Sequence, residues 1–196
     1  MHNFINTLNL LCLLNLPLSM QAQKYIIQNY DNVVESFDGN DILTKDGTKI
    51  SLKLVYDDKL LILTRHGEKA DFSKNAELSE AGEARSERLS KILRKAPVAD
   101  MVYSSDFIRT INTIKPYCLS KNINWQLYNP ANQAELAAKL TPYKRILISG
   151  HSNSVPALIN LLTGSNMAEL DEDDYSNLFF VKIPKNGPKT IYIFKY

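Results

Sequence analysis

From residue 59 onward, short apolar runs alternate with amphipathic stretches, and this alternation restricts the chain to a small set of folds. Residues 60–64 form a continuous apolar run, which is typical of a buried parallel strand. Helical periodicity follows, with Ser79 as the N-cap and Pro97 as the terminator. Three more strand–helix pairs are expected, with strands at 101–103, 123–128 and 145–149 and helices at 108–116 or just beyond, 131–140 and 155–162. We therefore predict an α/β fold, a three-layer α/β/α sandwich with a mainly parallel sheet.

Two hairpins flank this alternating region. Asp46-Gly47 is a good hairpin turn between apolar runs at 42–44 and 50–54, and Gly187 lies in a second turn between 178–183 and 190–194. The sequence therefore predicts a short N-terminal β extension, residues 23–57, followed by one domain, residues 58–196.

Residues 1–22 have the composition of a signal peptide. They contain no Lys, Arg, Asp or Glu, are rich in leucine over 8–18, and end with Pro17 and the small residue Ala22. The stretch is short and interrupted for a membrane span, so we expect export to the periplasm or the cell exterior and no stable membrane insertion after removal. An amphipathic or disordered N-terminus is the alternative. Removal would leave Cys118 as the one cysteine, most simply a small core residue, so no internal disulfide is expected.

The net charge argues against nucleic acid as a partner. The formal charge is +2, and no basic run interleaves with aromatic residues, so nucleic-acid binding is not expected.

Polar groups follow three of the predicted strands. The first strand leads into Arg65 and His66, the second into 104–106 with Arg109 one turn into the next helix, and the fourth into His151. Carboxyl ends of parallel strands lie at one edge of a sheet, where ligands bind in open α/β folds. Two guanidinium groups, two imidazoles and a helix N-terminus suit a doubly charged phosphoryl group. One imidazole could act as the nucleophile and the other could stabilise charge.

Four ordered motifs carry a family resemblance: residues 65–68 (Arg-His-Gly-Glu), 78–82 (Leu-Ser-Glu-Ala-Gly), 102–106 with 109–110, and 150–153 (Gly-His-Ser-Asn). Over about residues 58–165 the chain resembles branch 1 of the histidine phosphatase superfamily, the phosphoglycerate mutase-like group. The resemblance implies the phosphoglycerate mutase-like fold and a small phosphorylated substrate. It implies that His66 attacks phosphorus and becomes a phosphohistidine, while Arg65, Arg109 and His151 complete the phosphate pocket. It also implies hydrolysis by water without a metal or an organic cofactor.

The general acid is less well defined by the sequence. In many relatives a glutamate from the segment after the second arginine protonates the leaving group, which makes Glu135 the tentative candidate. A solvated helix carboxylate is the alternative reading of Glu135, and Asp106 and Glu68 are rival acids.

Other readings of the same residues are weaker. Residues 150–154 approximate a nucleophile elbow, but Ser154 replaces the final glycine and no histidine follows Ser152. A two-histidine metal site is disfavoured because Arg65 and Arg109 would repel a cation. The expectation is therefore an exported, metal-independent phosphoric monoester hydrolase of the histidine acid phosphatase type. A catalytically weak pseudophosphatase or anion-binding module, and a protein phosphohistidine phosphatase, stay open as alternatives.

Overall fold

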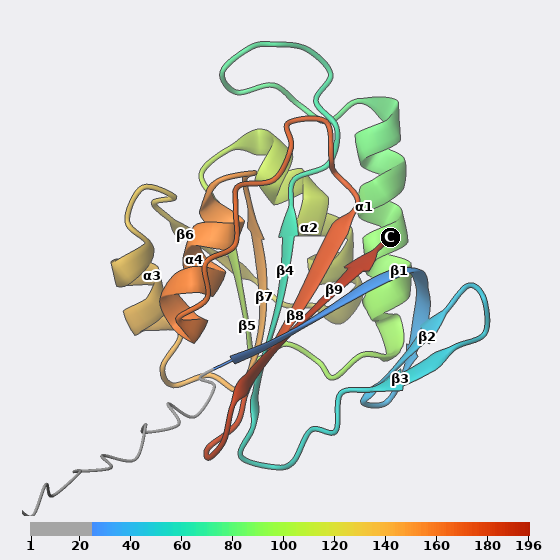
Figure 1. Cartoon of the computed structure of the whole chain (residues 1–196). Helices are drawn as coiled ribbons and strands as arrows, with labels where there is room; N and C mark the ends of the chain where they lie inside the picture. Colours follow the sequence, from blue (N-terminus) through green and yellow to red (C-terminus); the bar gives the residue numbers. More distant parts are fainter. Residues whose placement is uncertain (1–24) are drawn as a thin grey trace, which may run out of the picture.

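The fold is built on one nine-stranded sheet, seen in a computed structural model that describes residues 25–196 (Figure 1). The strands are β1 (Tyr25–Asp38), β2 (Asp41–Thr44), β3 (Lys49–Ser51), β4 (Lys59–Arg65), β5 (Met101–Ser105), β6 (Trp125–Tyr128), β7 (Arg145–Gly150), β8 (Asn177–Ile183) and β9 (Lys189–Lys195). The helices are α1 (Glu80–Ile92), α2 (Ile108–Lys121), α3 (Gln133–Lys139) and α4 (Ser154–Thr163), with a 3₁₀ turn at Leu93–Lys95. The predicted signal peptide, residues 1–22, lies outside the described residues.

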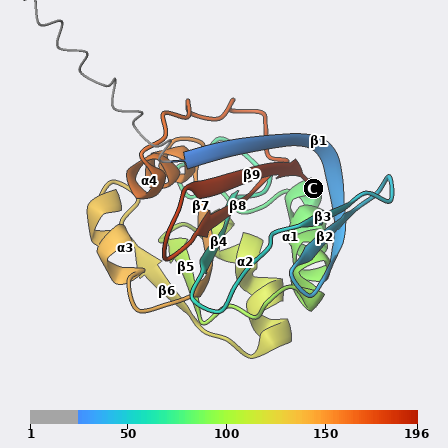
Figure 2. The same ribbon diagram turned by 60° about the horizontal axis from the view of Figure 1, so that its bottom comes forward.

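Helices cover both faces of the sheet (Figures 1 and 2). Successive β4 side chains point to opposite faces. Leu60 and Ile62 pack with α1 and α2 in one apolar core, and Leu61 and Leu63 pack with α3 and α4 in the other. This double burial explains the unbroken apolar run at 60–64 and confirms the predicted layers.

The prediction of a mainly parallel sheet was wrong. The strand order is β3-β2-β1-β9-β8-β4-β7-β5-β6, and six of the nine strands in the described residues take part in an antiparallel pair. The block β4-β7-β5-β6 is parallel, as the strand–helix alternation requires. The β8–β9 hairpin then lies antiparallel to β4, and the β2–β3 hairpin lies antiparallel to β1. Short hairpin connections impose antiparallel pairing, so the sheet is mixed.

The residues between 25 and 51 extend the sheet rather than forming a separate unit. β1 pairs in parallel with β9 over Tyr25–Asn29 and again at Val33, and then turns to pair with β2. Figure 2 shows β1 running along β9 at the side away from α2. The extension therefore covers the β9 side of the sheet.

Helix α2 runs further than its sequence suggests. The helix was expected to close near Pro116 or just beyond it, but Pro116 lies inside the helix and the C-cap is Asn122, in the left-handed conformation. Proline removes one hydrogen bond, while Tyr117 and Cys118 continue the buried face of the helix. Core packing therefore outweighs the local preference of proline.

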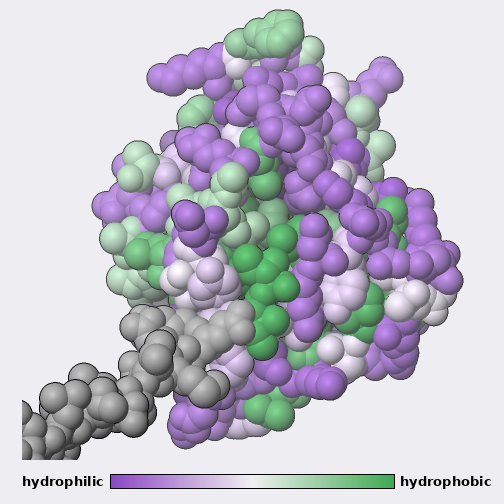
Figure 3. Space-filling model, viewed as in Figure 1, coloured by the Kyte–Doolittle hydropathy of each residue, from purple (hydrophilic) through white to green (hydrophobic). Residues whose placement is uncertain are grey.

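The surface is mostly polar. Figure 3 shows hydrophilic residues over the loops at the upper end and hydrophobic residues near the centre of this face, where β1 crosses. Ile26 and Ile27 of β1 are among the exposed apolar side chains. Among residues 25–196 no helix is both long and apolar enough to cross a membrane.

Candidate active site

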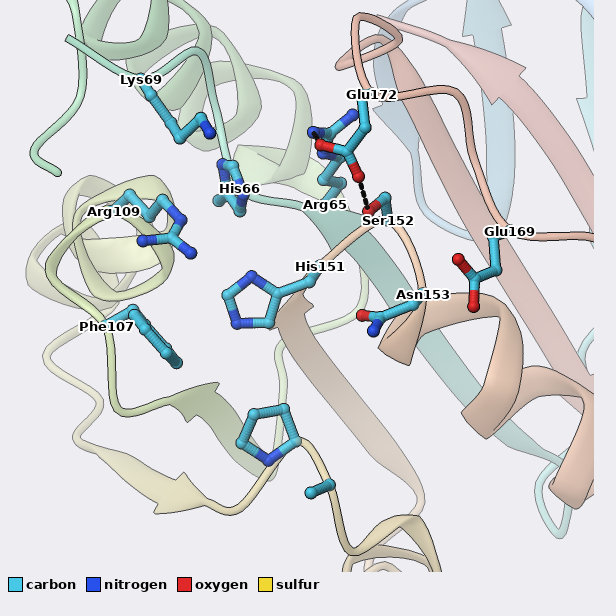
Figure 4. Close-up of a pocket in the computed structure, with 12 residues that line it drawn as sticks. Arg65, His66, Lys69, Phe107, Arg109, His151, Ser152, Asn153, Glu169 and Glu172 are labelled. Atoms are coloured by element: carbon cyan, nitrogen blue, oxygen red, sulfur yellow. Dashed lines mark hydrogen bonds and ion pairs between the residues drawn. The ribbon is translucent and has the colours of Figure 1, made fainter. Parts of the chain in front are cut away.

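A cavity of about 410 Å³ opens where the carboxyl ends of β4, β7 and β5 meet (Figure 4). These three neighbouring strands are parallel, so the residues that follow them arrive at the same edge. The predicted Arg65, His66, Arg109 and His151 all line this cavity. The remaining lining residues are Lys69, Phe107, Pro130, Ala131, Ser152, Asn153, Glu169 and Glu172.

The loop after β4 lies directly on the first turn of α1. Gly67 and Gly82 face each other, and a Cβ on Gly67 would lie 2.9 Å from the carbonyl oxygen of Gly82. A Cβ on Gly82 would clash with the backbone of Glu68. Only glycine at both positions allows this approach, which places His66 at the base of the cavity. This packing is the physical reason for the two glycine-containing motifs.

His66 is buried, with 3% of its surface exposed, and its ring is oriented by the backbone. Its Nδ1 lies 2.7 Å from the carbonyl oxygen of Gly67. Because a carbonyl oxygen only accepts hydrogen bonds, the proton is on Nδ1 and Nε2 keeps its lone pair. Burial, and to a smaller extent the charge of Arg109, lowers the pKa of His66 to about 3. The imidazole is therefore neutral at physiological pH, the state that a nucleophile requires.

His151 is held by a chain of hydroxyl groups. Its Nε2 lies 2.8 Å from Ser105 Oγ, Ser105 donates to Thr110 Oγ1 at 2.9 Å, and Thr110 donates to the carbonyl oxygen of Phe107 at 2.8 Å. Since Ser105 has only one proton to give, it accepts from His151, so His151 carries its proton on Nε2. Burial first, and then the charges of Arg109 and Arg65, lower the pKa of His151 to about 4. The two imidazole rings are 5.4 Å apart between centroids.

The two arginines bring positive charge to the same cavity. Arg109 stacks over Phe107 at 4.5 Å and donates to the carbonyl oxygen of Lys74 at 3.0 Å. Burial and the neighbouring Arg65 lower the pKa of Arg109. Arg65 is 1% exposed and lies 4.1 Å from the ring centroid of Tyr175. The described residues contain no cluster of three or more His, Cys, Asp or Glu side chains suited to hold a metal ion.

The structure places Glu135 and Asp106 outside this cavity. Both line a neighbouring cavity, with Phe107 and Pro130 common to the two. Glu135 forms an ion pair with Lys139 at 2.7 Å, which lowers its pKa. A carboxylate in that state is a poor proton donor, so the geometry does not favour Glu135 as the acid.

The carboxylate of Glu68, the other rival acid, has a structural role. Arg85 binds its carboxylate with both Nε and Nη2, at 3.0 and 2.6 Å, and also donates to the carbonyl oxygen of Tyr196 at 2.8 Å. Burial alone would raise the pKa of Glu68, but the hydrogen bonds from Arg85 outweigh it and lower the pKa. Glu68 thus fastens the nucleophile loop to α1 and the end of β9.

Several residues of the cavity have no distinctive sequence signal. Glu169 and Glu172 lie in an acidic run that reads as a solvated loop, yet both line the cavity. Figure 4 shows these carboxylates on one side of the cavity and Arg109 and Lys69 on the other. Tyr175, which the sequence could not place, lies 5.8 Å from His66 between ring centroids.

Comparison with known proteins agrees with this geometry. Residues 61–129 match the model of the histidine phosphatase superfamily, branch 1, and they include the loop of His66 and the helix of Arg109. The match agrees with the resemblance to branch 1 of the histidine phosphatase superfamily that the sequence motifs predicted.

Solved structures share the fold at low sequence identity. The α-ribazole phosphatase from Shigella flexneri is 16% identical, with a TM-score of 0.58, over 70% of this chain and 96% of that one. A mycobacterial glucosyl-3-phosphoglycerate phosphatase is 12% identical, with a TM-score of 0.58, over 70% and 99%. The protein histidine phosphatase SixA, solved with tungstate, is 19% identical, with a TM-score of 0.53, over 67% and 93%. At these identities the similarity shows the fold alone. No curated protein sequence matches this chain.

Proposed function

We propose that this protein is a metal-independent phosphomonoester hydrolase that acts through a phosphohistidine on His66. The observation that carries the proposal is the 2.7 Å contact between His66 Nδ1 and the carbonyl oxygen of Gly67. Because a carbonyl oxygen only accepts, this contact puts the proton on Nδ1 and leaves the lone pair of Nε2 available in a cavity that also contains two arginines. The neighbouring positive charge favours a phosphoryl dianion over a metal cation.

The reaction follows from the residues of the cavity. The Nε2 lone pair of His66 attacks phosphorus, and the bond from phosphorus to the leaving oxygen breaks as the N–P bond forms. Arg65, Arg109 and His151 bind the transferring oxygens, and the dianion raises the pKa of His151 because it stabilises the imidazolium. The leaving oxygen takes up a proton from solvent. A water molecule then attacks phosphorus, the N–P bond breaks as the new P–O bond forms, and the water loses a proton to solvent, which releases inorganic phosphate and restores the lone pair of His66.

Export to the periplasm or the cell exterior is part of the proposal and rests on the composition of residues 1–22. It would give the enzyme access to small phosphorylated molecules outside the cytoplasm.

A phosphohistidine of a protein is the second candidate substrate. It is favoured by the position of Glu135, which is ion-paired outside the cavity. A phosphoramidate has a good leaving group and needs less help from a general acid than an alkyl ester does. Turnover of a phosphohistidine peptide, with glycerol phosphate left intact, would favour this candidate.

The decisive experiment is hydrolysis of p-nitrophenyl phosphate by the purified protein in EDTA, beside the His66→Ala variant. We expect turnover by the wild type, none by the variant, and a phosphorylated His66 in acid-free rapid-quench samples. Variant activity close to that of the wild type would refute the assigned nucleophile. A folded wild type that binds phosphate without turning over substrate would identify a pseudophosphatase.

A further inference from the structure

The guanidinium group of Arg65 is held by one segment of the chain. Its Nη1 donates to the carbonyl oxygens of Asp171 at 2.7 Å and Asp174 at 3.3 Å, and its plane lies against Tyr175. The segment 171–175 therefore contacts the guanidinium group through two backbone carbonyls and an aromatic ring. Its Nε is buried and has no hydrogen-bond acceptor among the described residues.

One carboxylate of this segment lies on the arginine itself. Glu172 Oε2 accepts a hydrogen bond from Arg65 Nη2 at 3.0 Å, and Glu172 Oε1 accepts one from Ser152 Oγ at 2.6 Å (Figure 4). Arg65 is 1% exposed at its side chain whereas Glu172 is 79% exposed. The ion pair thus joins a buried, fixed cation to an anion at the solvent side of the cavity.

This contact occupies Nη2 of Arg65, a donor that a bound oxyanion would also use. Carboxylates and phosphates bind guanidinium through the same in-plane N–H donors, and a second anion at the same donors is repelled. Nη1 already donates to two backbone carbonyls. Glu172 and an incoming phosphoryl group therefore compete for the remaining N–H donors of the guanidinium group. The exposed carboxylate can leave at low cost, because water solvates it once it is released.

We propose that Glu172 competes with the phosphoryl group for Arg65 and thereby sets the affinity of the site for phosphate and its esters. This inference rests on the proposed function, in which Arg65 binds the phosphoryl group. Substrate binding displaces the carboxylate, and the carboxylate returns to Arg65 as inorganic phosphate departs. Glu172 would therefore weaken product inhibition as well as substrate binding.

The test is calorimetric titration of inorganic phosphate into the full-length wild type and the Glu172→Gln variant. We expect the variant to bind phosphate about fivefold more tightly or better, because one negative charge beside the ligand is removed. The matched control is Asp173→Asn, which removes an exposed carboxylate one residue away that does not line the cavity. Its phosphate affinity should stay within about twofold of the wild type.

Kinetics provide an independent readout. With p-nitrophenyl phosphate, Glu172→Gln should lower both KM and the inhibition constant of phosphate without raising kcat. Ser152→Ala, which frees one carboxylate oxygen, should shift both constants in the same direction by less.

The outcomes separate this inference from the proposed function. Equal or weaker phosphate binding by Glu172→Gln, or equal tightening by Asp173→Asn, would overturn the role of Glu172 while leaving turnover by the wild type intact. A wild type that neither binds phosphate nor hydrolyses p-nitrophenyl phosphate would overturn both.

Discussion

Ser105 Oγ lies 2.8 Å from His151 Nε2 and fixes which nitrogen of that imidazole carries the proton. Ser105 also donates to Thr110, so its hydroxyl cannot donate to the imidazole as well. The other ring nitrogen of His151 consequently has a free lone pair, and it can take up a proton when an anion binds. A buried hydroxyl on β5 thus sets the protonation of the histidine that directly follows β7.

Ser105→Ala should lower kcat/KM by about 10- to 100-fold, the cost of losing a hydrogen bond to a charged group. Part of the loss should appear as a higher KM, because His151 takes up its proton when the phosphoryl dianion binds. Steady-state kinetics with p-nitrophenyl phosphate would measure the change. Ser104→Ala is the matched control, since Ser104 is equally buried but donates to a backbone carbonyl. Equal losses in the two variants would point to a general packing effect.

Folding stability should fall between pH 7 and pH 5. Unfolded histidine takes up a proton near pH 6.5, whereas burial keeps the pKa of His66 at about 3 and that of His151 at about 4. In this window the unfolded state binds more protons, so acid favours unfolding. His66 alone contributes up to about 2 kcal/mol of loss at pH 5.

Urea unfolding at pH 7 and pH 5 would measure this loss. In His66→Asn the free energy of unfolding should differ less between pH 7 and pH 5, because an amide does not titrate. An unchanged difference would show that other groups dominate the pH dependence.

Gly82→Ala should destabilise the protein although the residue is helical. Glycine to alanine within a helix normally stabilises by about 0.5–1 kcal/mol. Here the new Cβ would meet the backbone of Glu68, and overpacking of this kind costs about 1–3 kcal/mol. Chemical denaturation would measure the sign of the change. A more stable variant would contradict the close approach of the two segments.

Glu135→Gln should change kcat for an alkyl phosphate by less than about threefold, since general-acid residues usually contribute about 100-fold or more. Glu135 lines the neighbouring cavity and pairs with Lys139. The assay should use glycerol phosphate, because a poor leaving group depends most on a proton donor. A hundredfold loss would restore Glu135 as the acid.

The strand–helix alternation could be predicted because its signals are local. Buried strands such as 60–64 are continuous apolar runs, and Ser79 and Gly164 mark helix ends. The direction of strand pairing was harder to predict from the sequence. The pairing of β8 with β4 and of β1 with β9 depends on contacts between distant segments, and such contacts leave no periodic pattern in the sequence.

The candidate site divides in the same way. Arg65, His66 and His151 come directly after strands or at their last residue, so topology alone brings them together. Glu172 contacts Arg65 across 107 residues, and its acidic neighbourhood is typical of a solvated loop. Only the tertiary structure shows that this loop reaches the cavity.

The central position of β4 has a further consequence, for hydrogen exchange. β4 pairs along its length with β7 on one side and β8 on the other, so hydrogen bonds to these two strands protect its amides from exchange. They should exchange with deuterium only through the largest unfolding events, while amides of the exposed residues 171–173 should exchange through local openings. The backbone amides of Arg65 and His66, at the end of β4, thus belong to the slowest-exchanging part of the molecule. The amide of Glu172, whose carboxylate contacts Arg65, belongs to one of the fastest-exchanging segments.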